Sequence, residues 1–299
     1  MLQELDRRLS GSLRFAEPMS RHTSFRIGGP ADALFVPRDL AELKRCLKET
    51  RELGIPVTVI GNGSNLLVCD GGIRGLVIKL SGTLDWVHIS GVKVRAGCGV
   101  LLAALAYKAV EADLGGLEFA AGIPGTLGGG VIMNAGAYGG EMKDVVTSVR
   151  VVSPSGEERD VSAAEMAFGY RHSSLQNSGS YVLEVAMELK PGDRESSLGM
   201  IRELNDRRKA KQPLALPSAG SVFKRPEGYY AGPLIEKAGL KGMRIGDAVV
   251  SPLHANFIVN VGNAAAADVL ALIALVKEAV WRECGVLLEQ EIKVLGEQR

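Results

Sequence analysis

The chain has 299 residues, about twice the length of a typical domain, so two domains or three small ones are expected. Its 46% hydrophobic and 23% charged residues are typical of a globular protein and exclude a low-complexity or disordered chain. The formal net charge of +1 gives no electrostatic basis for nucleic acid or an anionic membrane as the main partner. Any basic site must therefore be local.

The amino terminus is charged from Glu4 and lacks the apolar run of a secretion signal, so we expect the mature chain to start here and to be cytoplasmic. The longest apolar stretch, 264–276, contains Asp268 and is too short to span a bilayer, which predicts no membrane insertion. Neither the cysteines nor the histidines have the spacing of a metal site, so we expect no metal and reduced core cysteines at 46, 69, 98 and 284.

The first predicted elements form a strand, helix, strand unit. Asp39 can cap a helix whose leucines share one face, and Gly54 can end it before a strand at 57–60. The loop 61–65 follows that strand directly. Loops in this position commonly bind ligands.

The later elements alternate between short strands and helices. Ser90-Gly91 predicts a tight hairpin between strands at 84–89 and 92–96, and a helix is expected at 101–112. Further strands are expected at 145–152, 181–189 and 256–261. Asn263 predicts the cap of a helix over 264–284, which Gly285 can end, and an extended segment follows from Leu287. This order favours an α+β fold over a regular doubly wound sheet.

Two glycine-rich segments indicate a phosphate-bearing ligand, because only glycine lets backbone N–H groups approach and turn around a pyrophosphate. In the first, 61–65, two glycines alternate with Asn62, Ser64 and Asn65, whose side chains can donate to phosphate oxygens. A polar turn would explain this segment alone equally well. In the second, 122–140, eight of nineteen residues are glycine, a content that should destabilise any regular element. Neither segment has the Rossmann or the Walker pattern, so nucleotide hydrolysis is not expected.

Seven sequence blocks, in order over nearly the whole chain, resemble the UDP-N-acetylenolpyruvoylglucosamine reductase family of bacterial peptidoglycan synthesis. They are Thr23-Ser-Phe-Arg-Ile-Gly-Gly-Pro-Ala-Asp32, Gly61-Asn-Gly-Ser-Asn65, Gly122-Ile-Pro-Gly-Thr126, Asn134-Ala-Gly-Ala-Tyr138, Tyr170-Arg-His-Ser173, Gly220-Ser-Val-Phe-Lys-Arg-Pro226 and Leu288-Glu-Gln-Glu-Ile292. The chain lacks an insertion with an extra tyrosine between Arg171 and Ser221, so it resembles the shorter form of this family.

The resemblance implies an FAD-binding fold of the vanillyl-alcohol-oxidase (PCMH) type with a smaller α+β substrate domain. The expected parts are 1–80 plus 286–299 and 81–205 for FAD, and 206–285 for substrate. It also implies that NADPH reduces FAD and that hydride then passes to the enolpyruvyl group of the UDP-sugar, giving UDP-N-acetylmuramate. A monomer is expected. The FAD is expected to be noncovalent, since neither glycine-rich segment contains a histidine.

The resemblance also implies site residues. Cofactor contacts are expected at Ile27, Gly28, Gly61, Asn62, Gly63, Ser64, Asn65, Gly122, Ile123, Pro124, Gly125, Thr126, Gly128, Asn134, Gly136, Ala137 and Tyr138. The catalytic positions are Arg171, Ser221 and Glu291. Substrate contacts are expected at Lys211, Lys224, Arg225, Tyr230, Lys241 and His254. Ordinary surface lysine is the competing interpretation for some of these, and Arg225 stands where some family members have asparagine.

The catalytic assignments fit the chemistry. Hydride addition to an enolpyruvyl methylene carbon pushes charge onto the carboxylate, where the guanidinium of Arg171 can bind it through two hydrogen bonds. The enolate-like carbon must then take a proton, which the hydroxyl of Ser221 could supply. Glu291 is a candidate acid, base or orienting group in the terminal strand. Glu289 is the competing choice, because alternation places both carboxylates on one strand face.

Two alternatives remain open from the sequence. One is an FAD-dependent sugar or alcohol oxidase of the same fold. The other is a non-catalytic nucleotide-sugar binding protein that keeps the glycine-rich segments as scaffold.

Overall fold

The computed structural model describes residues 1–298 and divides them into two compact units, each discontinuous in the sequence. The first unit contains 1–14, 33–62 and 75–208, and the second contains 15–32, 63–74 and 209–298. The chain passes between the units five times: within β1 (Arg14–Pro18), β2 (Pro30–Phe35), β5 (Ile73–Lys79) and α5 (Arg194–Lys211), and between Asn62 and Gly63. The three-part division expected from the sequence stays a prediction.

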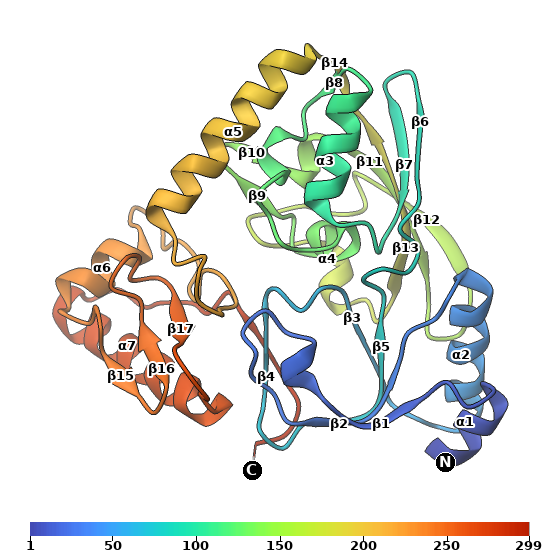
Figure 1. Cartoon of the computed structure of the whole chain (residues 1–299), viewed down its shortest axis with the longest axis horizontal. Coiled ribbons are helices and arrows are strands. Elements are labelled where there is room, and N and C mark those ends of the chain that lie inside the picture. Colours follow the sequence, from blue (N-terminus) through green and yellow to red (C-terminus); the bar gives the residue numbers. More distant parts are fainter. Residues whose placement is uncertain (299) are drawn as a thin grey trace. The chain divides into compact units, whose positions relative to one another are not determined.

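The first unit is built on a five-stranded sheet of order β12-β11-β13-β7-β6, in which all neighbours are antiparallel (Figure 1). Its strands are β6 (Val87–Ser90), β7 (Lys93–Gly97), β11 (Val146–Val152), β12 (Glu158–Ser162) and β13 (Tyr181–Glu188). Gly91 turns the β6–β7 hairpin with a φ of +58°, which confirms the hairpin predicted at Ser90-Gly91.

Four helices complete the main part of this unit: α1 (Leu2–Arg8), α2 (Leu40–Glu52), α3 (Leu102–Glu111) and α4 (Leu127–Ile132). Asp39 caps α2 by accepting a hydrogen bond from Glu42 N at 2.8 Å, as predicted. Strand β3 (Val57–Ile60) pairs in parallel with 76–79 of β5, so the loop that starts at Gly61 follows a buried strand end. Helix α4 packs on β7 and β13, which fixes the second glycine-rich segment against the sheet.

Shorter elements of the first unit are β8 (Leu114–Gly115), β9 (Gly136–Ala137), β10 (Gly140–Glu141), β14 (Lys190–Pro191) and 3₁₀ turns at Glu118–Ala120, Met142–Asp144 and Ser174–Asn177. Apolar side chains from α1 to α5 and from the sheet form a single core in this unit, including Phe35, Leu76, Leu102, Val149 and Val185.

The second unit has its own core, around Phe223, Ile235, Val269 and Leu272. Its elements are a 3₁₀ turn at Met19–Arg21, β4 (Leu66–Val68), α6 (Ala231–Lys237), β15 (Arg244–Ile245), β16 (Ala248–Val250), β17 (Ile258–Asn260), α7 (Ala266–Cys284) and β18 (Lys293–Leu295). Helix α7 packs on α6 and on the three-stranded sheet β15-β16-β17, as Figure 1 shows in orange and red. Strand β18 pairs in parallel with β4.

The start of α7 differs from the sequence prediction. The helix begins at Ala266 rather than Ala264, and Asn263 is not its cap. The Asp268 carboxylate accepts from Ala265 N, while the Asp70 carboxylate accepts from Ala266 N at 2.9 Å and from Ala267 N at 3.0 Å. A side chain that follows β4 therefore satisfies the first helical N–H groups. Gly285 ends the helix with a φ of +65°, as predicted.

Three of the four cysteines lie in the cores, as expected, whereas Cys284 at the end of α7 is only half-buried. Burial raises the pKa of the Cys46 and Cys98 thiols to about 12, which keeps them protonated and unreactive. In residues 1–298, no helix is both long and apolar enough to cross a bilayer. Within the same residues, no three His, Cys, Asp or Glu side chains gather as a metal site would require.

Candidate active site

Residues 61–62 of the first glycine-rich segment lie against residues 122–126 of the second in the first unit. Asn62 Nδ2 donates a hydrogen bond to the Pro124 carbonyl at 2.7 Å. A Cβ placed on Gly61 would lie only 2.3 Å from Thr126 Oγ1, so no other residue fits at position 61 without displacing Thr126. The sequence segments 61–62 and 122–126, far apart in the chain, thus form one surface.

This surface carries backbone donors without protein partners. In the part of the chain that the structure describes, the N–H groups of Gly61, Asn62, Gly122 and Gly125 make no hydrogen bond, and all four residues are half-buried. Half-buried N–H groups normally find a partner, and a group of them on adjoining glycine loops suits the oxygens of a phosphate. The residues present therefore fit the diphosphate of a dinucleotide cofactor.

Part of the second glycine-rich segment is regular, contrary to the expectation from its composition. Residues 127–132 form helix α4, and Thr126 caps it by accepting from Gly129 N at 3.4 Å. A Cβ on Gly128 would lie 2.9 Å from Cys98 Cβ, and one on Gly130 would lie 2.9 Å from Leu102 Cδ1. Close packing against Cys98 therefore requires glycine at position 128, independently of any contact between Gly128 and a cofactor, whereas at position 130 the Leu102 side chain would have to shift.

Asn134 is fully buried, and its amide is used within the protein. Its Nδ2 donates to Glu141 Oε2 and to the Gly169 carbonyl, both at 2.9 Å, while its Oδ1 accepts from Lys143 N at 2.9 Å. Both N–H donors are therefore committed, which leaves Asn134 the role of holding the loop around 169 in place. A contact between this side chain and a cofactor stays a prediction.

Arg171 lies two residues beyond that anchored carbonyl, with its backbone in the left-handed region at a φ of +54°. This conformation is unfavourable for a residue with a side chain and persists only where the surroundings hold it. Gly169 and His172 exchange both backbone hydrogen bonds, and Gln176 Nε2 donates to the Arg171 carbonyl at 2.8 Å. The half-buried guanidinium stacks 5.3 Å from the Tyr170 ring centre and donates to the Gly136 carbonyl at 3.2 Å.

Glu141 is a further charged group of this region. Burial opposes ionisation of its carboxyl, but hydrogen bonds from Lys143 and Asn134, with the charges of Lys143 and Arg171, keep its pKa below the usual value. It is therefore a carboxylate at neutral pH. Gly136 and Ala137 form the short hairpin β9–β10 with 140–141, and the exposed Tyr138 lies in its turn.

The sequence reasoning missed Arg208, near the end of α5. Its guanidinium donates to the Gly122 carbonyl, and burial lowers its pKa although the neighbouring Tyr138 opposes this shift. Nothing local in the α5 sequence distinguishes this arginine from Arg202 or Arg207, which lie on the same helix. Only the fold reveals that it reaches the glycine-rich segment.

The remaining cofactor candidates belong to the second unit. Gly63 is buried with a φ of +66°, and a Cβ there would lie 2.1 Å from the His22 carbonyl. Thr23 Oγ1 donates to the Ile27 carbonyl at 2.9 Å, and Gly28 packs on Val68. Asn65 Nδ2 donates to the Glu291 carbonyl at 3.3 Å rather than lying free for a phosphate. Ser64 is half-buried.

Ser221 and Glu291 are close in the second unit through main-chain pairing. Val222 O accepts a hydrogen bond from Glu291 N at 2.8 Å, and Phe223 forms an antiparallel bridge with Gln290. On the other side, Ser221 forms a bridge with Phe257. Ser221 is half-buried, and its hydroxyl has no hydrogen-bond partner in residues 1–298. That hydroxyl can therefore donate to a bound molecule.

The two carboxylates near the carboxyl terminus have different surroundings. Strand β18 begins only at Lys293, so the prediction that Glu289 and Glu291 lie within the terminal strand is wrong. Glu289 is 72% exposed and forms an ion pair with Lys224 at 2.5 Å. Glu291 is half-buried. Both residues bond to the 222–224 segment through their main chains, so only the lower exposure of Glu291 distinguishes it from Glu289.

The predicted substrate residues are all in the second unit. Arg225 stacks on the exposed ring of Tyr230 at 4.1 Å, and Lys241 pairs with Glu236 at 2.7 Å. Lys211 is exposed at the end of α5. His254 is half-buried, edge-on to Phe257, and burial, with the charge of Lys241, keeps its pKa below the usual value despite an opposing backbone hydrogen bond.

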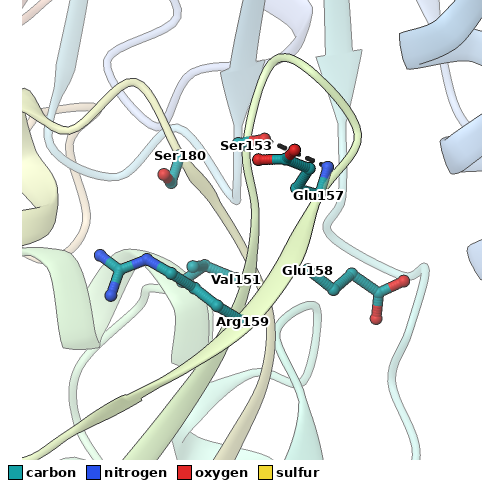
Figure 2. A pocket seen from close by; sticks show the side chains of 6 residues that line it. All are labelled: Val151, Ser153, Glu157, Glu158, Arg159 and Ser180. Carbon is teal, nitrogen blue, oxygen red and sulfur yellow. Dashed lines mark hydrogen bonds between the residues drawn. The ribbon is translucent and has the colours of Figure 1, made fainter.

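A surface hollow lies elsewhere, at the turn between β11 and β12 (Figure 2). Ser153 Oγ accepts a hydrogen bond from Glu157 N there at 3.1 Å. The residues that line the hollow are Val151, Ser153, Glu157, Glu158, Arg159 and Ser180. None of the residues expected at a cofactor or substrate site lines this hollow.

Comparison with known proteins assigns this chain to a family. Residues 31–162 match the model of an FAD binding domain, and residues 212–295 match that of the UDP-N-acetylenolpyruvoylglucosamine reductase C-terminal domain. The reductase of Alkaliphilus oremlandii is 51% identical over 94% of this chain and 93% of its own. The chain belongs to the UDP-N-acetylenolpyruvoylglucosamine reductase family.

Other members of the family agree with this assignment. The Clostridioides difficile reductase is 48% identical over 95% of this chain and 94% of its own. The crystal structure of UDP-N-acetylenolpyruvylglucosamine reductase from Thermus caldophilus superposes with a TM-score of 0.81 at 39% identity, covering 93% of this chain and 97% of that one. The α+β, FAD-binding fold and the identification as a flavin-dependent oxidoreductase are thereby confirmed. The roles of single residues stay predictions.

Proposed function

We propose that this protein uses NADPH to reduce UDP-N-acetylenolpyruvoylglucosamine to UDP-N-acetylmuramate in the cytoplasm, as a monomer. Relatives of this name at about 50% identity support the reaction. The local basic groups of the second unit, Lys211, Lys224, Arg225 and Lys241, support a substrate with a diphosphate and a carboxylate. Sedimentation of the purified protein tests the monomer, and fractionation of cells tests the location.

The residues that would hold FAD are those of the joined glycine-rich segments. The half-buried N–H groups of Gly61, Asn62, Gly122 and Gly125 would bind its diphosphate noncovalently, and Arg208 would keep the Gly122 carbonyl turned away from the phosphate oxygens. When bound, the flavin supplies hydride chemistry, with NADPH as the source and the enolpyruvyl methylene carbon as the acceptor.

Arg171 would bind the carboxylate of the enolpyruvyl group. The negative charge on this group grows as hydride arrives, so a fixed guanidinium stabilises the transition state more than the bound substrate. Gln176 and the Gly169–His172 pair hold the backbone of Arg171, and the Tyr170 ring and the Gly136 carbonyl contact its guanidinium. These contacts fit this role because they restrict the guanidinium before the reaction begins.

Ser221 would donate the proton that completes the reduction. The observation that carries this assignment is its half-buried hydroxyl, which has no partner among residues 1–298 and lies on a segment tied to Glu291. Because an enolate-like carbon is strongly basic, a hydroxyl is acidic enough to protonate it. Glu291 would orient this hydroxyl or return the proton to it.

The experiment separates the two half-reactions. In Ser221→Ala, anaerobic bleaching of the flavin by NADPH should proceed at the wild-type rate, while reoxidation by UDP-N-acetylenolpyruvoylglucosamine should slow by about 100-fold or more. Ser218→Ala, a serine of the same segment, is the control. Equal slowing of both half-reactions would remove Ser221 as the proton donor. Reduction of the flavin by sugars or alcohols, followed by its reoxidation by oxygen, would identify an oxidase instead of a reductase.

A further inference from the structure

Asn256 makes an unusual set of contacts with the segment that carries Ser221. Phe223 N donates to Asn256 Oδ1 at 3.0 Å, and Asn256 Nδ2 donates to Phe223 O at 2.9 Å. In addition, Val222 N donates to the main-chain carbonyl of Asn256 at 2.8 Å. Three hydrogen bonds thus join one buried asparagine to two consecutive residues directly after Ser221.

The side-chain amide of Asn256 acts here as a peptide group would. An amide has the same donor and acceptor as the backbone, so it can pair with both groups of Phe223 where no neighbouring strand residue does so. The Ser221–Phe257 bridge lies next to this contact. The 221–223 segment is therefore held by this side chain in addition to its main-chain bonds, and Asn256 supplies the partner that a continuous ladder would give to Phe223.

The turn that presents Asn256 is itself fixed. Asn256 N donates to His254 Nδ1 at 3.3 Å, and His254 N donates to Ser251 Oγ at 3.3 Å. His254 Nδ1 can accept only in the neutral ring with its proton on Nε2, and burial favours that neutral form. The His254 ring also packs edge-on to Phe257, the residue opposite Ser221.

We propose that Asn256 is a positioning residue for Ser221: its amide fixes the 221–223 segment so that the Ser221 hydroxyl meets the substrate carbon that takes the proton. This inference rests on the proposed role of Ser221. Because proton transfer requires the donor within hydrogen-bond reach of the accepting carbon, a small displacement of the segment slows the proton step. Reduction of the flavin by NADPH uses no proton from Ser221 and is unaffected.

Asn260 provides a matched control within the same stretch of chain. It is also buried, 4% exposed against 8% for Asn256, and its side-chain amide makes three hydrogen bonds where that of Asn256 makes two. Those bonds go to Phe25 O, Gly262 N and Ala264 N, away from the Ser221 segment. Asn260→Ala should therefore match Asn256→Ala in stability loss while leaving the position of Ser221 unchanged.

The test measures both half-reactions in the full-length, FAD-loaded protein. Asn256→Ala should slow reoxidation by UDP-N-acetylenolpyruvoylglucosamine by about 10- to 100-fold and leave reduction by NADPH unchanged. Asn256→Asp keeps the shape and the acceptor for Phe223 N but loses the donor, so it should slow reoxidation less and serves if the alanine variant does not fold. Asn260→Ala should change either rate by less than about threefold.

A double-mutant cycle shows whether Asn256 acts through Ser221. In the Ser221→Ala background, Asn256→Ala should add less than about threefold to the slowing, because the group that it positions is gone. Multiplicative effects of the two substitutions, or equal slowing of reoxidation by Asn256→Ala and Asn260→Ala, would overturn the inference. If Ser221→Ala itself leaves reoxidation at the wild-type rate, the role proposed for Ser221 fails instead.

Discussion

Arg171 and Ser221, the two residues proposed to act on the enolpyruvyl group, are held in opposite ways. Arg171 lies in an irregular loop at a φ of +54°, and side chains fix that loop: Asn134 on the Gly169 carbonyl and Gln176 on the Arg171 carbonyl. Ser221 lies in an extended segment between Phe257 and the stretch that contains Glu291, where most tethers are main-chain bonds.

This difference predicts which substitutions disturb the Arg171 loop and which disturb the Ser221 segment. A loop held by side chains can lose its conformation through one substitution, whereas a paired segment keeps most of its bonds whatever its side chains are. Asn256 is the exception, a side chain that replaces a missing strand neighbour. Substitutions around Arg171 should therefore affect stability and catalysis together, and those around Ser221 mainly catalysis.

The largest effect is expected from Arg171 itself. Arg171→Ala should slow reoxidation of the reduced flavin by substrate by about 100- to 1000-fold, because the growing carboxylate charge loses its partner. Arg171→Lys should recover part of the rate, since the charge remains but the two-point contact does not. Rapid-mixing absorbance measures both. Arg150→Ala, which removes an exposed arginine paired with Asp160, should behave as wild type, and wild-type reoxidation in Arg171→Ala would contradict the assignment.

The next largest effect concerns the side chains that hold the Arg171 loop. Asn134→Ala leaves Lys143 N without its partner and the Gly169 carbonyl with only the bond from His172 N, in a partly buried place, at a cost of about 2–3 kcal/mol. The thermal midpoint should fall by roughly 4–12 °C, with slower reoxidation in the protein that remains folded. Calorimetry measures the midpoint, with the exposed Asn177→Ala as control. An unchanged midpoint would show that the loop does not need this amide.

A smaller effect, on stability, is expected from two glycines of α4, the buried Gly128 and the exposed Gly129. Gly128→Ala forces a Cβ to 2.9 Å from Cys98 and should destabilise the protein by about 1–3 kcal/mol. Gly129→Ala adds a methyl group on an exposed helical surface, 3.5 Å from Thr126 Oγ1, and should stabilise by up to about 1 kcal/mol. Thermal unfolding of the apoproteins compares them. Opposite signs are expected, and equal signs would refute the packing argument.

The smallest effect is the pH dependence of stability from His254. Its folded pKa lies below the unfolded value of 6.5, so its contribution to stability is complete above pH 6.5 and declines as the pH falls below that value. Protonation of Nδ1 would also break the bond from Asn256 N. The thermal midpoints of wild type and His254→Gln are measured from about pH 5 to about pH 8. The two midpoints should converge at the acidic end. A constant difference over that range would exclude this titration.

Local features were predictable from the sequence. The cap at Asp39, the turn at Ser90-Gly91 and the stop at Gly285 depend on residues within a few positions of each other, and the structure confirms all three. The glycine-rich segments were recognised because a high glycine content demands an explanation wherever it occurs.

Contacts between distant parts of the chain were not predictable. The first N–H groups of α7 are satisfied by Asp70, 196 residues before Ala266, and not by the nearby Asn263. Likewise, Asn256 and Phe223 are 33 residues apart, and no sequence pattern pairs them. The sequence does not distinguish Arg208 from a surface arginine, and only the path of α5 places it beside Gly122. In each case the fold determines the partner, whereas the residue type indicates only that a partner is needed.

The pairing of Asp70 with the start of α7 has a consequence for how the chain is made. A ribosome adds about 5–20 residues per second, so roughly 10–40 s pass between synthesis of Asp70 and synthesis of the helix that it caps. Throughout that interval β4 also lacks its partner β18, and its apolar residues have no core to enter. Until α7 and β18 have been synthesised, Leu67 of β4 therefore stays exposed, and a chaperone can bind this segment.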